Sequence, residues 1–142
     1  MAAMDGHRNE LEPIYRTLPT SVFQADLNPT NILLDGNENF VGVFDFNLCG
    51  KDVLLNYLFR ENFHNDFSVE LEMIFGALRI VREYYSFSDL EKSVALPLYR
   101  CLKPLRYIRA YQLKEAGTDM DAVRTLLDEI ELYQTKEIVF PI

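Results

Sequence analysis

The sequence has only two cysteines and two histidines, which excludes several kinds of site. Cys49 and Cys101 cannot form the multiple cross-links of a disulfide framework, and we expect both thiols to be reduced. Neither cysteine has another Cys or a His at metal-ligand spacing, and His7 and His64 each stand alone. A zinc site is therefore not encoded.

Glycine is also scarce, with 6 residues in 142, and no two glycines have the G-x-G spacing. The pattern G-x-x-x-x-G-K-S/T is missing as well. Loops of both kinds hold phosphates through backbone N–H groups that approach the ligand closely. The sequence therefore encodes no phosphate-binding loop of either type.

Positive charge is in deficit, because 14 Lys and Arg face 22 Asp and Glu, for a formal net charge of -8. A nucleic-acid partner would require a basic stripe, so we expect none. An acidic surface could attract a cationic small molecule through screened long-range forces. Acidic composition is also common in cytosolic proteins, and we give this explanation more weight.

No apolar run approaches the roughly 20 residues that span a bilayer, and the first residues lack the apolar region of a signal peptide. We therefore expect a cytoplasmic protein without a membrane partner. With 49% hydrophobic residues, the 142-residue chain can bury one core. We predict a single domain over residues 1–142.

A hairpin is the clearest structural signal in the chain. Residues 32–34 and 40–44 are short apolar runs, and residues 35–39 between them are rich in turn formers. A short strand at 22–23 leads into the preceding loop, where Asn28-Pro29 marks a turn. Asp45 then falls where the second strand of the hairpin ends. We expect its side chain to face the loop that carries Asp26 and Asn31.

Beyond residue 52 the apolar residues recur at helical spacing. The fold class is therefore mainly α with a small β-hairpin, an α+β architecture. It divides into a loop and hairpin at 22–47 and a helical subdomain at 52–142. The predicted helices are 52–59 with Asp52 as its cap, 69–85, a run from Ser88 to Gly117 interrupted at Pro97 and Pro104, and a last helix capped by Thr118 or Asp119.

Four basic residues, Arg100, Lys103, Arg106 and Arg109, recur at intervals of three, as on one helix face. Such a stripe could contact phosphate. Because the chain has an excess of carboxylates, a solvated face paired with them is the favoured interpretation.

The run Asp26-Leu27-Asn28-Pro29-Thr30-Asn31-Ile32-Leu33 resembles the catalytic stretch of the aminoglycoside phosphotransferase and choline kinase-like family, which has a protein kinase-like fold. Asp45-Phe46-Asn47 stands at the position of the family's metal-binding Asp. Cys49-Gly50-Lys51-Asp52, followed by Asn56-Tyr57-Leu58, looks like the family's next segment, Gly-Asp-Pro-x-x-Asp-Leu. The close match covers roughly a quarter of the chain, and the helical remainder fits the family's C-terminal lobe in pattern only.

The resemblance implies an ATP-dependent phosphotransferase that transfers phosphate to a small-molecule hydroxyl. Asp26 would orient or deprotonate that hydroxyl, while Asn31 and Asp45 would hold Mg²⁺ on the phosphates of ATP. The acceptor could be cationic. Candidates for contacting it, by charge alone, are Asp66, Glu70, Glu83 and Asp89 on the later helices.

The chain departs from the family's pattern at several positions. The family's motif begins with His-Gly, whereas this chain has Gln24 and Ala25. In the wider fold that His bonds backbone near the metal-binding Asp, and a Gln amide could partly replace it. The Pro and the second Asp of the later segment are Val53 and Asn56 here.

The resemblance also implies an N-terminal lobe that binds the nucleotide, yet only 23 residues precede Gln24. We therefore expect the C-terminal lobe alone, with apolar surface uncovered around Phe23, Phe44 and Phe46. Such a surface predicts a homo-oligomer or a complementing chain. Two hypotheses follow: the catalytic lobe of a phosphotransferase, truncated or completed by another chain, or a non-catalytic, kinase-derived binding module that acts through protein partners.

Overall fold

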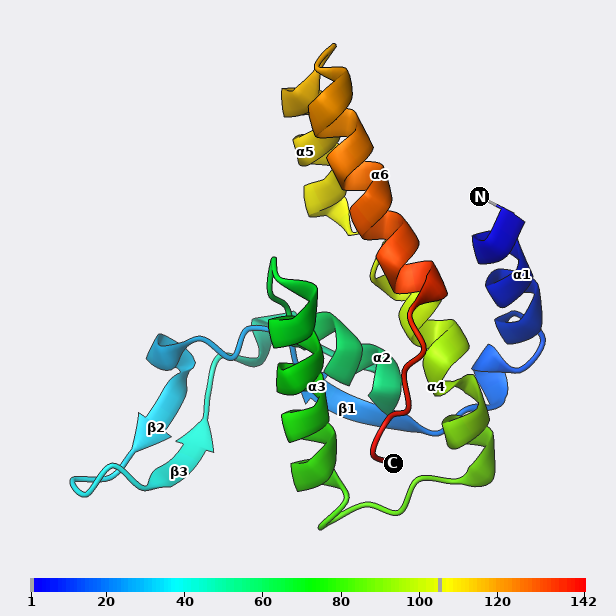
Figure 1. The fold of residues 1–142 in the computed structure, drawn as a ribbon. Helices are drawn as coiled ribbons and strands as arrows, with labels where there is room; N and C mark the ends of the chain where they lie inside the picture. Colours follow the sequence, from blue (N-terminus) through cyan, green and yellow to red (C-terminus); the bar gives the residue numbers. More distant parts are fainter. Residues whose placement is uncertain (1, 105) are drawn as a thin grey trace.

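The computed structural model describes residues 2–104 and 106–142, and within them the chain is mainly helical with two small antiparallel sheets (Figure 1). This confirms a mainly α fold with a β-hairpin, and it adds a second sheet. The helices are α1 (Ala2–Leu11), α2 (Leu54–Glu61), α3 (Phe67–Val81), α4 (Asp89–Leu102), α5 (Tyr107–Ala116) and α6 (Met120–Thr135). The strands are β1 (Thr20–Gln24), β2 (Ile32–Leu34), β3 (Phe40–Val43) and β4 (Cys49–Val53), with 3-10 turns η1 (Tyr15–Thr17), η2 (Pro29–Asn31) and η3 (Phe46–Leu48).

β1 pairs with β4, a strand that the sequence pattern did not indicate. Phe23 lies opposite Gly50 in this sheet, and a Cβ on Gly50 would lie 2.9 Å from the Phe23 ring. The glycine thus leaves room for the ring, which stacks on Tyr57 of α2 at a centroid distance of 4.9 Å. This stack fixes the end of β1, where the loop that carries Asp26 begins.

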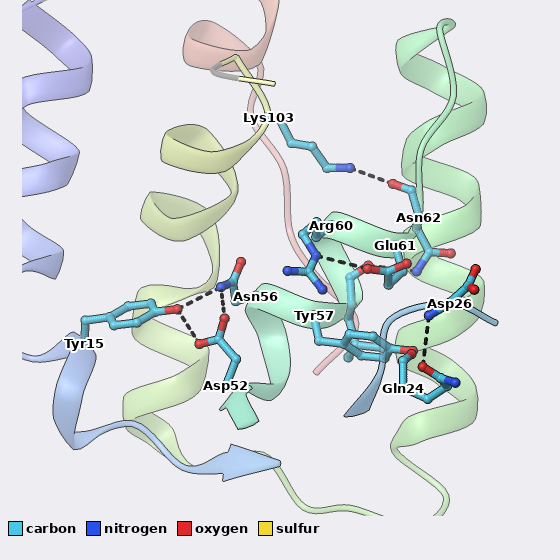
Figure 2. A network of polar contacts seen from close by, with 11 residues as sticks. Tyr15, Gln24, Asp26, Asp52, Asn56, Tyr57, Arg60, Glu61, Asn62 and Lys103 are labelled. Atoms are coloured by element: carbon cyan, nitrogen blue, oxygen red, sulfur yellow. Dashed lines mark hydrogen bonds and ion pairs between the residues drawn. The ribbon is translucent and has the colours of Figure 1, made fainter. Parts of the chain in front are cut away.

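Asp52 does not cap α2, so that prediction was wrong. It lies in β4, and Val53 separates it from the helix, which has no side-chain cap. The Asp52 carboxylate instead accepts hydrogen bonds of 2.9 Å from the Tyr15 hydroxyl and 2.5 Å from the Asn56 amide (Figure 2). Burial, and then the Asp52 carboxylate, raise the pKa of Tyr15 to about 12. The network ties the segment before β1 to β4 and α2.

β2 and β3 form the predicted hairpin, which projects from the helical body (Figure 1). Asp35 organises its turn by accepting the backbone N–H groups of Asn37 at 2.8 Å and Asn39 at 2.9 Å. The hydrogen bond from the Asn39 side chain, and to a smaller extent those from these backbone groups, lower the pKa of the Asp35 carboxyl. Glu38 has a left-handed φ of 64° in the same turn. The tip of the hairpin therefore presents two carboxylates.

The predicted helices form, with differences at their boundaries. Asp66 caps α3, Ser88 caps α4, and Asp119 caps α6, each by accepting backbone N–H groups of the first turn. α4 runs through Pro97, so the interruption expected there was wrong. Pro104 does lie in the break between α4 and α5.

The apolar core lies between α2, α3 and α4, and the C-terminal segment packs into it. The Phe140 ring lies against Phe59 and Tyr99 at centroid distances of 5.0 and 5.4 Å. Fully buried side chains at its centre are Leu55, Phe59, Ile74, Leu78 and Tyr99.

A charged cluster is buried beside this core. Glu70 is completely buried, with one carboxylate oxygen 3.1 Å from the Lys103 ammonium and 3.6 Å from the Arg106 guanidinium. Lys103 is 2% exposed and donates to the Asn62 carbonyl at 2.6 Å (Figure 2). The predicted pairing with carboxylates is confirmed for Lys103, Arg106 and Arg109. The single solvated helix face was wrong, because α4 ends at Leu102 and α5 begins only at Tyr107. Glu70, buried in this way, is not placed to contact an acceptor.

Cys49 is exposed and Cys101 is half-buried, and neither forms a disulfide. Burial raises the pKa of the Cys101 thiol. Across residues 2–104 and 106–142, no helix combines the length and the apolar character needed to cross a membrane.

Candidate functional site

The loop after β1 carries Asp26, and its own side chains fix its shape. Asn28 accepts the backbone N–H of Thr30 at 2.9 Å and donates to one Asp26 carboxylate oxygen at 2.8 Å. Asn31 donates to the other carboxylate oxygen at 3.1 Å and to the Asp26 carbonyl at 2.9 Å. The Asp26 and Asn31 side chains are therefore in direct contact, and the carboxylate is held in one orientation.

Asn31 also joins this loop to the hairpin. It is 6% exposed, and its backbone carbonyl accepts the N–H of Phe44 at 3.1 Å. Its side-chain nitrogen is committed to Asp26, whereas its side-chain oxygen accepts no hydrogen bond from any described residue. That amide oxygen is the atom of Asn31 that could bind a cation.

Asp45 lies one residue beyond Phe44, and its backbone is left-handed, with φ 59° and ψ 69°. The residue is exposed, and its carboxylate accepts the N–H of Asn47 at 3.4 Å, which caps η3. Among the described contacts, none joins this carboxylate to Asp26 or Asn31. The structure thus brings the backbone of Asp45 to the site, but its carboxylate bonds within its own turn. The expectation that this side chain faces the loop with Asp26 and Asn31 was therefore wrong.

Gln24 connects the two halves of the site. Its side-chain nitrogen donates to the carbonyls of Phe44, at 3.3 Å, and Asp45. Its side-chain oxygen accepts the backbone N–H of Asp26 at 3.1 Å (Figure 2). We call these hydrogen bonds the Gln24 bridge. The expectation that the Gln24 amide bonds the backbone near Asp45 is confirmed. Tyr57, which the sequence did not single out, donates to the Gln24 carbonyl at 3.1 Å.

The Gln24 bridge can be tested with Gln24→Glu, which keeps the shape but replaces the donor by a carboxylate oxygen. Gln24 is 7% exposed, so we expect a loss of about 1–3 kcal/mol in the free energy of unfolding from the unpaired carbonyls. Amide hydrogen exchange in residues 25–31 and 44–48 should become at least about tenfold faster. Gln24→His keeps a donor and should lose less. Equal exchange in wild type and Gln24→Glu would mean that the bridge does not hold the site.

The donor set fits Mg²⁺ better than a transition metal. No cluster of three or more His, Cys, Asp or Glu side chains suited to a metal occurs in the part of the chain that the structure describes. Mg²⁺ in phosphoryl-transfer sites uses one or two protein oxygens, with phosphates and water completing its shell. The Asn31 amide oxygen is one such oxygen. The Asp45 carboxylate, which accepts the Asn47 N–H, would have to turn toward Asn31 to be the second.

Apolar side chains around the site are uncovered. Phe44 is 44% and Phe46 is 54% exposed, while Phe23 is half-buried under Tyr57 and the Arg60 guanidinium. A groove of about 430 Å³ lies beside Gln24, between β1, the hairpin and η3. The acceptor candidates lie elsewhere: Asp66 is a helix cap, and Glu83 and Asp89 are exposed beyond α3 and at the start of α4.

Comparison with protein-family models, with curated proteins and with solved structures found no match to this chain.

Proposed function

We propose that this chain is the C-terminal lobe of an ATP-dependent phosphotransferase that resembles the aminoglycoside phosphotransferase and choline kinase-like family and acts on a small-molecule hydroxyl. The observation that carries the proposal is the Gln24 bridge, in which one amide holds the backbone of both Asp26 and Asp45. Asn31 joins the same two segments through Asp26 and Phe44. The residues that resemble the family's motif are therefore held together by contacts suited to a shared site.

In this proposal Asp26 orients the acceptor hydroxyl and takes its proton while the new O–P bond forms and the bond to ADP breaks. The hydrogen bonds from Asn28 and Asn31 keep the carboxylate oriented for that role. Asn31 and Asp45 supply oxygen ligands for Mg²⁺. The bound ion would offset the negative charge that spreads over the transferred phosphate.

Further groups that bind the phosphates of the nucleotide would come from another chain. Residues 20–53 contain one basic side chain, Lys51, and five carboxylates, so they offer little positive charge to phosphates. A complementing chain over the apolar surface would supply these groups. A cationic acceptor, attracted by the acidic surface, and a cytoplasmic location belong to the same proposal.

The second candidate is a non-catalytic binding module derived from a kinase. It is favoured by the exposure of Phe44 and Phe46 and by the Asp45 carboxylate, whose described hydrogen bond stays within its own turn. In this case the hairpin binds a protein partner, and the chain binds no nucleotide.

Calorimetric titration with ATP and Mg²⁺ separates the two candidates. If the lobe is catalytic, we expect saturable binding that weakens at least about tenfold, or 1.4 kcal/mol, in Asp45→Asn. Asn tolerates a left-handed backbone and can still accept the Asn47 N–H, so the substitution removes only the negative charge. Asp45→Ala should abolish binding.

Asp35→Asn at the hairpin tip is the matched control, because it removes a carboxylate from the same hairpin at its far end. We expect it to bind ATP and Mg²⁺ as the wild type does. No binding by the wild type at millimolar nucleotide would contradict catalysis by this lobe alone and favour the binding module.

A further inference from the structure

Nine large apolar side chains are exposed on the loop, the hairpin and the strands beside them. We call this surface the hairpin face. Two of its members, Val22 on β1 and Phe40 on β3, are 74% and 68% exposed. Exposed apolar side chains gathered on one segment of the chain are a usual mark of an interaction site. Its members are Val22, Leu27, Leu33, Leu34, Phe40, Val41, Phe44, Phe46 and Leu48.

Members of the hairpin face line part of the groove of about 430 Å³: Val22, Leu27, Phe40 and Phe46. Both sheets beside it are two-stranded. Each strand therefore leaves one edge without a ladder partner in the described structure. Free edges and an apolar groove together suit an added strand, which bonds through its backbone and inserts alternate side chains.

The rim of the hairpin face is acidic. Asp35 and Glu38 stand at the hairpin tip, Asp26 and Asp45 at its base, and Lys51 is the only basic residue between 20 and 53. Hydrogen bonds from Asn39 hold the pKa of the Asp35 carboxyl low, so it is charged at neutral pH. A complementary partner would carry positive charge around an apolar centre.

The same charges disfavour a second copy of this chain as the occupant. In a two-fold dimer each patch meets itself, so the two acidic rims would face each other. Like charges brought together across an interface cost free energy. An anionic membrane surface is disfavoured for the same reason.

We infer that the hairpin face binds an amphipathic β-strand of another polypeptide, with alternate apolar side chains in the groove and Lys or Arg against the acidic rim. The inference needs only the apolar surface, the free edges and the rim. It does not require a nucleotide, a cation or catalysis. The titration with ATP can therefore fail while this inference stands, and the reverse also holds.

The test uses two labelled peptides of about seven residues, within the usual length of a strand. In one Lys alternates with Val, and in the other Glu replaces each Lys. Fluorescence anisotropy with the full chain should show saturable one-to-one binding of the Lys peptide, weakened by salt, and no binding of the Glu peptide. Equal binding of both peptides, or no binding of either, would overturn the inference.

Variants locate the binding. Val22→Glu and Phe40→Glu each place a negative charge in the apolar centre of the face. Each should weaken the affinity for the Lys peptide at least about tenfold. Glu38→Asn removes one rim charge at a left-handed position and should weaken it about threefold. Val139→Glu, 83% exposed outside the face, is the matched control and should bind normally. If Val22→Glu and Phe40→Glu bound the Lys peptide as tightly as the wild type does, the proposed site would be refuted.

Sedimentation tests the second copy directly. Without peptide, we expect the wild-type chain and the Phe40→Glu variant to sediment as species of the same mass. A dimer that dissociates in Phe40→Glu would assign the hairpin face to self-association and reject the inferred partner.

Discussion

Replacing Glu70 by alanine is expected to lower the free energy of unfolding by about 3–5 kcal/mol, the usual cost of removing one partner from a buried ion pair. Glu70 is fully buried and Lys103 is 2% exposed, so the ammonium would be left charged with only the Asn62 carbonyl as a described partner besides Glu70. The Tyr99 hydroxyl would also lose its acceptor, which is 3.4 Å away. Urea unfolding followed by circular dichroism measures the loss.

Two variants show whether the charge is the cause. The double variant Glu70→Leu with Lys103→Met removes both charges and should recover most of the stability, because apolar replacements of buried pairs are often neutral. Glu72→Ala lies on the exposed side of α3 and should change stability by less than about 0.5 kcal/mol. A Glu70→Ala variant as stable as Glu72→Ala would show that the cluster is not structural.

Stability should fall steeply as pH rises from about 10 to 12. Burial, and then the Glu70 charge, raise the pKa of Tyr133 from 10.0 to about 12, and Tyr15 and Tyr99 shift in the same direction. A phenol whose pKa is raised by folding stabilises the fold below the unfolded pKa, and this contribution is lost as pH rises through the folded pKa. For Tyr133 the two units correspond to about 3 kcal/mol.

Lys103 acts in the opposite direction at lower pH. Burial lowers its pKa from 10.5 to about 8, so its contribution to stability is present above pH 10.5 and lost as pH falls through about 8. The curve of unfolding free energy against pH should therefore rise between about pH 8 and 10.5 before it falls. Tyr133→Phe should make the fall above pH 10 shallower, whereas Tyr84→Phe, at a position 85% exposed, should leave it unchanged. An identical alkaline fall in Tyr133→Phe and wild type would contradict this assignment.

The hairpin and the loop before it could be predicted because their signals are local. Asp35 and its neighbours form a turn through hydrogen bonds that span at most four residues, and Asn28-Pro29 starts a turn by similarly short contacts. The helix caps at Ser88 and Asp119 are local as well. Such patterns depend little on the rest of the fold.

The errors concern long-range partners. β4 has weak strand character by sequence and forms because β1, some thirty residues earlier, pairs with it. Lys103 and Glu70 look like surface charges, yet each is buried by a partner on another helix. For the candidate site, the contact of Asp26 with Asn31 follows from their spacing. The side-chain direction of Asp45 does not, because it depends on the turn formed by η3.

The hairpin is anchored at its base, where Asn31 meets Phe44 and Gln24 meets Asp45. A two-stranded hairpin is marginally stable by itself, so its ordering depends on what binds to it. The inferred polypeptide would bind to β2 and β3. When these strands are ordered, Asn31 and Asp45 are held in place. Binding at either place therefore changes the affinity at the other, and thermodynamic linkage makes the factor the same in both directions.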